Sequence, residues 1–343
     1  VASGLASEGL LTPLDEFMPR GILRNLSVSV PLEENASDRL LLAANLDNVA
    51  VDGVRGSPAM SGIQGYLELD YSFTEQILNG LAEVDSENFT IHLANLFTES
   101  WQYDYVNGRV KFRLDTSDQY QVKLSSSMIV AESEIVDGRA QFSTVLNRSP
   151  EGEVSSELDL LVGASRIDGA KKSPYLPDGP RVDPGLYNTM EWLDRALLDG
   201  AVQESGVIFR GNSQRGSPRL EKTFQAFFNF EQADVEYIEE WPQLANVAGA
   251  VVIENGRTSI RVDGGRTMGL SIGPTTAVAE RDEDGQQWLT INGVAGGASQ
   301  AGLDFLNVAP LDDTLGDTIA NWQVEGGVQA ELALDIPLGA SGL

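Results

Sequence analysis

This chain of 343 residues has few candidates for a nucleophile–histidine arrangement, since it contains one histidine and no cysteine. The histidine, His92, lies in the strand-like stretch NFTIHLANL, where it alternates with apolar residues. A serine or cysteine nucleophile would depend on it as a base, and no G-x-S-x-G motif accompanies it. We interpret His92 as a strand residue without a catalytic role.

Metal and cofactor motifs are also missing from the sequence. Zinc sites use clusters of cysteine and histidine, and there are none. Two acidic stretches, 281–287 and 310–317, contain part of a calcium loop but not its full ligand set. We interpret both as solvated turns, and the glycine-rich stretch 293–302 as a tight turn, because none matches a phosphate-binding loop. We therefore predict no metal and no cofactor.

Acidic residues outnumber basic ones by 51 to 23, which gives a net charge of −28. A chain this acidic is not expected to bind nucleic acid, because it is poorly suited to neutralise phosphates. Carboxylates are so numerous that no pair stands out as a glycosidase acid and nucleophile, and that chemistry stays open. No run of roughly 18–20 apolar residues predicts a membrane span, and no secretory signal is present. We expect the chain to be a mature piece or a segment of a longer protein.

The elements that would position any site are mostly strands. Apolar and polar residues alternate along much of the chain, and glycine and proline interrupt the pattern at short intervals. Helical spacing of apolar residues predicts one clear helix over 184–199, closed by Gly200, and shorter helical segments over 12–18 and 74–81. Four dipeptides typical of hairpin turns favour antiparallel pairing: Asn107–Gly108, Asp137–Gly138, Asn255–Gly256 and Asp284–Gly285.

One stretch of 25 residues occurs twice without a gap. Residues 45–69 align with residues 229–253 at a constant spacing of 184, so that Pro58 matches Pro242. We predict two related β units, 1–170 and 171–343, each opened by a helix. The proline lacks an amide hydrogen and should end a strand. Its neighbour Trp241 is then a core plug or, alternatively, a ligand contact.

Alternation leaves each predicted strand with one apolar face. An antiparallel sheet must cover such a face. It can close into a sandwich or barrel, or it can curl and leave an open trough. A trough would hold acyl chains, at roughly 0.8 kcal/mol for each buried CH₂. The residues alone leave these arrangements open.

Four segments in a fixed order carry a resemblance to a known family. They are 95–114 (a Phe followed by G-x-V-x-F), 173–202 (YLP … WL … AL … G), 228–257 (Y … WP … G) and 303–338 (L … FL … PL … W … G … L-x-IPL). Together they resemble the YhdP branch of the AsmA-like envelope proteins of Gram-negative bacteria, over nearly the whole chain.

The resemblance implies a mainly β fold, with long curved antiparallel sheets that form a repeating β-groove, taco-like in section, and a few short helices. It implies a protein that is not an enzyme and conducts phospholipid along an apolar groove in the periplasm, between inner and outer membranes. The implied partners are phospholipid acyl chains, the remainder of a longer membrane-anchored chain, and inner- and outer-membrane proteins. The alternative is a structural or adhesive β-module with a closed core.

The family has no catalytic motif to carry over, so the expected site consists of apolar strand positions only. The residues expected to line the groove are Leu46, Leu67, Leu69, Val110, Phe112, Phe228, Phe230, Val251, Ile253, Ile260, Val262 and Leu270.

Overall fold

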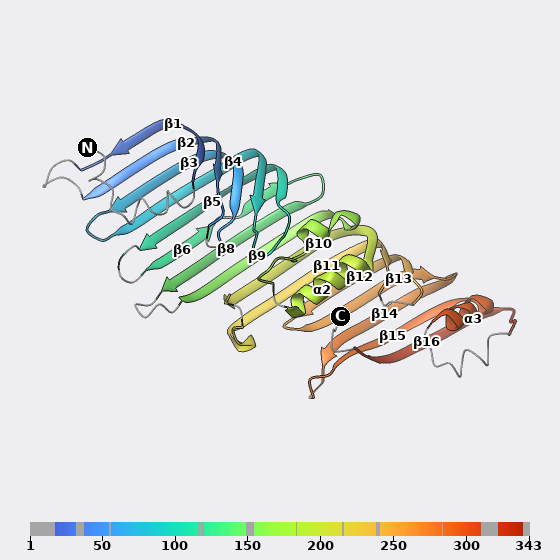
Figure 1. The fold of residues 1–343 in the computed structure, drawn as a ribbon. Helices are drawn as coiled ribbons and strands as arrows, with labels where there is room; N and C mark the ends of the chain where they lie inside the picture. Colours follow the sequence, from blue (N-terminus) through green and yellow to red (C-terminus); the bar gives the residue numbers. More distant parts are fainter. Residues whose placement is uncertain are drawn as a thin grey trace. The chain divides into compact units, whose positions relative to one another are not determined.

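The computed structural model describes residues 18–31, 38–54, 56–115, 117, 120–148, 154–182, 184–214, 216–237, 241–282, 284–309 and 322–338. Within these residues the chain is mainly β, as predicted, with sixteen strands and two short α-helices (Figure 1). The strands follow one another through a single sheet in chain order, except that β7 pairs with β5 and β8.

The chain divides into two compact units. The first consists of Val1–Gly163, Gly179–Val182 and Ile208–Thr223, and the second of Ala164–Asp178, Asp183–Val207 and Phe224–Leu343. The division after residue 170 stays a prediction, since these units interleave along the chain. Three strands have residues in both units: β9 (Val154–Asp168), β10 (Leu197–Asn212) and β11 (Lys222–Val235).

The other strands belong to one unit each. The first unit holds β1 (Arg20–Ser29), β2 (Arg39–Val51), β3 (Ala59–Ser72), β4 (Ile77–His92), β5 (Trp101–Asp115), β6 (Gln121–Ser126), β7 (Ile129–Glu132) and β8 (Asp137–Arg148). The second unit holds α2 (Pro184–Ala196), β12 (Leu244–Glu254), β13 (Arg257–Thr267), β14 (Leu270–Arg281), β15 (Gln287–Ala298), α3 (Ser299–Val308) and β16 (Gly327–Pro337).

Two of the four predicted hairpin turns are confirmed and two are wrong. Asn255–Gly256 joins β12 to β13 with φ angles of 48° and 92°, and Asp284–Gly285 lies in the turn before β15. Asn107–Gly108 instead continues β5, and Asp137–Gly138 begins β8. Gly108 serves close packing and not a turn. A Cβ at this position would lie 2.8 Å from Cγ1 of Ile129 in β7, so only glycine lets the two strands approach.

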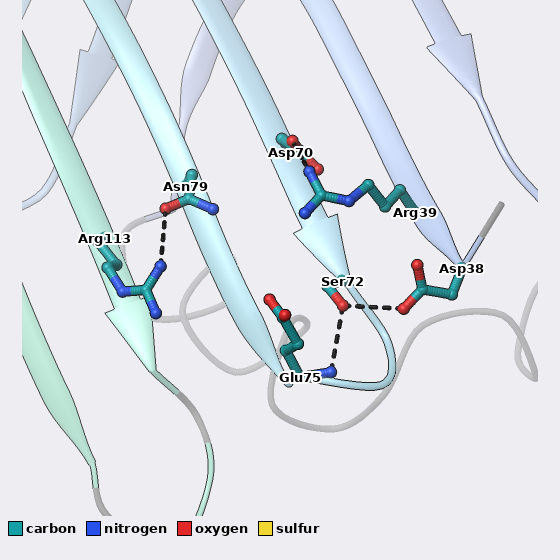
Figure 2. Close-up of polar contacts among 7 residues, drawn as sticks. All are labelled: Asp38, Arg39, Asp70, Ser72, Glu75, Asn79 and Arg113. Atoms are coloured by element: carbon teal, nitrogen blue, oxygen red, sulfur yellow. Dashed lines mark hydrogen bonds and ion pairs between the residues drawn. The ribbon is translucent and has the colours of Figure 1, made fainter.

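The helical segment expected over 74–81 is wrong, because a turn over 73–76 joins β3 to β4 there. Figure 2 shows how side chains hold this turn. The Ser72 hydroxyl donates to Asp38 at 2.9 Å and accepts the amide of Glu75 at 3.1 Å. The amide of Thr74 also donates to Asp38, at 3.3 Å. These hydrogen bonds satisfy backbone amides of the turn, and β4 begins directly after it at Ile77.

The helix expected over 184–199 is confirmed in part, since α2 ends at Ala196 and Leu197 begins β10. Gly200 lies in β10 and not at a helix end. Its φ is 130°, and a Cβ there would lie 2.7 Å from Cα of Ala233, so there is no space for a side chain. The stretch 293–302 is not a tight turn, because it runs from β15 into α3. The helix expected over 12–18 and the turn expected over 310–317 lie outside the described residues, apart from Met18.

Trp241 and Pro242 lie between β11 and β12, where the sequence predicts a strand break. The Trp241 ring lies 6.1 Å from the Tyr237 ring and 6.3 Å from the Phe305 ring of α3. The indole of Trp192 in α2 donates to the carbonyl of Tyr237 at 3.0 Å. These contacts favour the packing role for Trp241, because they join both helices to the end of β11.

The internal repeat reappears in strand pairing. Leu46 pairs with Gly65 between β2 and β3, and Phe230 pairs with Gly249 between β11 and β12, each 184 residues later. Both hairpins have register irregularities at the same positions. Asn48 and Gln232, also 184 apart, have φ angles of 51° and 53° at these irregularities. The two hairpins therefore bulge at the same place.

The core of the first unit lies where the β2–β3 and β3–β4 pairings are irregular, and it includes Val106 of the neighbouring β5. Val49, Ile63, Phe89 and Val106 are buried together, and Leu46 packs against them.

Candidate functional site

Register shows that the second unit has one apolar face. Paired residues on neighbouring strands project to the same side of a sheet, so a chain of pairs defines a row of side chains. One row runs Phe228–Val251–Ile260–Ala277–Ile291–Leu334, from β11 to β16. The rows on either side are Ala226–Ile253–Thr258–Ala279–Leu289–Ile336 and Phe230–Gly249–Val262–Thr275–Gly293–Leu332.

The opposite face of the second unit, here called its charged face, is polar. Arg257 pairs with Glu280 at 3.0 Å, and Arg261 with Asp263 at 3.3 Å. Two large apolar side chains stand out among them, Phe227 and Val252, which are 42% and 41% exposed. Phe227 precedes Phe228 and Val252 follows Val251 in the sequence. Each pair therefore offers one position on either face of the same strand for comparison.

The first unit has the same two-sided arrangement. Its apolar rows are Leu40–Tyr71–Leu78–Leu114–Val122–Leu146, Leu42–Leu69–Gly80–Phe112–Leu124–Thr144 and Ala44–Leu67–Ala82–Val110–Ser126. The Phe112 ring lies over Gly80, since a Cβ at that glycine would be 2.0 Å from Cζ of the ring. The ring thus covers the backbone of β4.

Most residues predicted to line a groove come together on these faces. In the first unit Leu67, Leu69, Val110 and Phe112 share one face. In the second unit the shared residues are Phe228, Phe230, Val251, Ile253, Ile260 and Val262. All ten are half-buried.

Two predicted residues are placed differently from the rest. Leu46 is half-buried and packs against the core of the first unit. Leu270 is 6% exposed and lies beyond a register irregularity in β14, where its Cδ2 would be 3.0 Å from a Cβ on Gly297. Sequence reasoning also missed Leu42, Ile291 and Leu334, although the alternation in QWLTI and ELALDI contained the signal.

The apolar faces are covered only in part. Tyr71, Ala279 and Leu289 in their outer rows are 2%, 2% and 5% exposed, whereas the ten predicted residues named above are half-buried. Their strands belong to one sheet, so no second sheet packs on them. Helix α3 lies against β15 and β16, and a Cβ on its Gly302 would be 3.3 Å from Val328. The helix therefore covers only the end of the face in the second unit, where Val328 pairs with Gly297.

A cavity of about 860 Å³ lies on the other side of the sheet in the first unit. Two cross-strand rows line it, Leu41–Asp70–Asn79–Arg113–Lys123–Val145 and Ala43–Glu68–Leu81–Lys111–Ser125–Ser143. The row between them, Leu42–Leu69–Gly80–Phe112–Leu124–Thr144, also lines the cavity. Because its side chains alternate to the opposite face, it contributes backbone to the floor. We call this cavity, with Ser27 and Ser29 at its β1 end, the charged groove.

The described residues show no arrangement typical of catalysis. Within them no three His, Cys, Asp or Glu side chains come close enough to hold a metal ion. His92 lies at the end of β4 opposite Ala59. Burial raises the pKa of Tyr237 to about 12, which keeps this phenol neutral. No helix of the described chain has the length and hydropathy of a bilayer span.

A sheet with one apolar face, one charged face and no second layer over the described strands is the architecture of a β-groove protein. Comparison with known proteins agrees: residues 2–341 match the family described as YhdP protein, and the chain belongs to that family. It is 23% identical, over 348 aligned residues, to the Intermembrane phospholipid transporter YhdP of Escherichia coli (strain K12). The alignment covers 89% of this chain and 27% of that protein, so the chain spans about a quarter of its relative's length. No solved structure matches it.

Proposed function

We propose that this chain conducts phospholipid along the apolar faces of its two units, as a periplasmic segment of a longer membrane-anchored protein. The observation that carries the proposal is the apolar row through Phe228, Val251 and Ile260, which crosses six strands without a charged residue. The name of the relative, an intermembrane phospholipid transporter, supports phospholipid as the cargo. Inner- and outer-membrane proteins are the proposed partners at the two ends of the route.

The chemistry of the rows suits a passage better than a fixed binding pocket. Each buried CH₂ of an acyl chain contributes about 0.8 kcal/mol, and such contacts have no preferred direction. Neighbouring rows offer similar contacts, so a chain can exchange one set for the next without a deep energy minimum. No catalytic step is needed for this role.

The alternative function, a structural or adhesive module, requires a closed core. The half-buried state of Phe228, Val251 and Ile260 argues against it, as does the lack of a second sheet over them among the described strands. A closed core would bury such side chains almost completely.

Photocrosslinking at matched positions tests which face carries lipid. A benzophenone amino acid replaces Phe228 or Val251 on the apolar face, and Phe227 or Val252 on the charged face. The protein is expressed in a Gram-negative bacterium, irradiated in the cells, purified and analysed for attached phospholipid by mass spectrometry. We expect lipid adducts at Phe228 and Val251 only. Equal labelling at all four positions, or none at Phe228 and Val251, would refute the proposal.

A charged residue introduced on the apolar face tests the proposed route, because it should reduce the amount of phospholipid that copurifies with the protein. Phe228→Glu and Ile253→Glu are expected to remove most copurified phospholipid, whereas Phe227→Glu should retain it. Circular dichroism and urea unfolding show whether each variant keeps its fold. If Phe228→Glu and Ile253→Glu unfold while Phe227→Glu does not, these side chains belong to a closed core and the structural alternative is correct.

A further inference from the structure

The charged groove of the first unit has an acidic half and a basic half. Glu68 and Asp70 lie on β3, and Lys111 and Arg113 lie on β5 with Lys123 beside them on β6. Neighbouring strands are about 4.8 Å apart, so β3 and β5 are separated by roughly 10 Å. That exceeds the Debye length of about 8 Å at physiological ionic strength. The two halves therefore act nearly independently.

The acidic half already has its partners. Asp70 pairs with Arg39 at 2.5 Å (Figure 2), and Glu68 accepts the hydroxyl of Tyr66 at 2.8 Å. Arg24 on β1 likewise pairs with Asp47, at 2.5 Å.

The basic half lacks such partners among the described residues. Lys111, Arg113 and Lys123 form no ion pair within the described chain. Arg113 donates only to the side-chain oxygen of Asn79, at 3.5 Å, as Figure 2 shows. Arg113 also interacts through its charge with Asp115, two residues further along β5. Among the described residues the three neighbouring cations thus share one carboxylate, which is unexpected in a chain with 51 acidic and 23 basic residues.

Neutral residues flank these cations on both sides. On β4 the paired residues are Leu81 and Asn79. On β8 the residues that follow in the same rows are Ser143 and Val145. An acidic residue at any of these positions would relieve the repulsion, as Glu83 does for Arg109 at 2.6 Å.

Register makes the repulsion direct, because Arg113 and Lys123 are paired across β5 and β6. Like charges in directly opposed positions destabilise a sheet. Lys111 adds a third positive charge two residues away. The arrangement costs stability in the free protein, and an anion bound among the three groups would reverse that cost.

We propose that the basic half of the charged groove binds a phosphate-bearing anion, with Lys111, Arg113 and Lys123 as its charge partners. Ser125 and Ser143, which are paired beside them, supply hydroxyl donors. Guanidinium and ammonium groups bind phosphate by short charge-assisted hydrogen bonds. The groove is open to solvent and has a volume of about 860 Å³, so a molecule larger than a single ion can enter it. The site faces away from the apolar rows and does not depend on the acyl route.

Calorimetric titration of the whole chain with glycerol 3-phosphate and with dihexanoyl phosphatidic acid tests the site. Binding should weaken as salt is added, because the contacts are exposed. Lys111→Gln, Arg113→Gln and Lys123→Gln should each lower the affinity about fivefold, as expected for one exposed charge contact. The triple variant should not bind glycerol 3-phosphate, whereas phosphatidic acid can still bind it through the apolar faces. Arg24→Gln, which removes a paired cation of the same face, should leave the affinity unchanged.

The two probes separate the sources of the phosphate. Equal affinity for both assigns the site to soluble phosphate compounds. A preference for phosphatidic acid that the triple variant loses assigns the site to a lipid headgroup. Glycerol as a third titrant should not bind. The proposal is overturned if neither phosphate probe binds, or if Arg24→Gln weakens binding as much as Lys123→Gln.

A stability measurement completes the test. Lys123→Gln should unfold at a slightly higher temperature than the parent protein at low salt, because it removes a like-charge pair. The variants are therefore expected to fold, and lost binding cannot be attributed to unfolding. A lower unfolding temperature for Lys123→Gln at low salt would contradict the assigned repulsion.

Discussion

The contact between Phe112 and Gly80 gives a prediction that can be worked out in energy terms. The two residues are paired across β4 and β5. A Cβ on Gly80 would lie 2.0 Å from Cζ and 2.4 Å from both Cε atoms of the ring. Gly80→Ala must therefore displace the ring, which can swing away because its far end makes the contact. The cost is the lost burial of a half-buried phenylalanine, about 1 kcal/mol.

A control glycine isolates that cost from the backbone effect. Replacing a strand glycine with alanine normally stabilises by about 0.5–1 kcal/mol. Gly138→Ala should show this gain, because its Cβ would be no closer than 3.8 Å to Ala131. Gly80→Ala should be near neutral or slightly destabilising. We therefore expect the two variants to differ by about 1–2 kcal/mol in the free energy of unfolding.

Urea unfolding of a double-mutant cycle provides the assay. In the background of Phe112→Ala no ring covers the glycine, so Gly80→Ala should stabilise as much as Gly138→Ala does. The coupling energy between the two positions should be about 1 kcal/mol. A coupling energy of zero, with Gly80→Ala as stabilising as Gly138→Ala in the parent protein, would refute the ring position and the face assignment of Phe112.

Three further predictions follow from local geometry. Gly65→Ala should cost more than about 2 kcal/mol in urea unfolding, because φ is 147° and a Cβ would lie 1.9 Å from the carbonyl oxygen of Glu83. The raised pKa of Tyr237, about 12 because of burial, keeps stability intact below pH ~10 and lowers it between about pH 10 and 12. The loss is at most about 2 kcal/mol after allowance for partial exposure, and Tyr237→Phe should abolish it. Hydrogen bonds from Thr74 and Ser72 lower the pKa of Asp38. The ionised carboxylate therefore stabilises the fold, and this stabilisation is lost as pH falls through the lowered pKa. Asp38→Asn should make Tm depend less on pH in the acid range.

Period-2 alternation was enough to predict the strands and the apolar side of each one. It predicts a shared face for Phe228 and Phe230, because residues two apart in a strand project to the same side. The alternation did not show which strands pair or in what register. The charged groove depends on that register, since Arg113 and Lys123 lie on different strands and meet only through the pairing of β5 and β6.

The errors came from local signals that longer-range structure overrode. Asn107–Gly108 has the composition of a hairpin turn, yet β7 lies against Gly108 and the strand continues. Leu270 fits the alternation of its neighbours, but the irregularity between Ile272 and Thr275 separates it from the regular part of β14. Such a bulge changes which face a residue joins, and nothing in the local pattern indicates it.

The internal repeat bears on the proposed lipid route, because equivalent positions in the two units differ in side-chain volume. At equivalent positions the first unit has Leu42 and Ala44 where the second has Ala226 and Phe228, so bulk moves from one row to the next. A close-packed interior would require compensating changes opposite each of these residues, because cores respond to single methylene groups. The paired residues on the next strand instead stay similar, Leu69 with Ile253 and Leu67 with Val251. An exchange of volume between rows, with unchanged apolar character on the next strand, is compatible with a fluid hydrocarbon partner and agrees with the proposed lipid route.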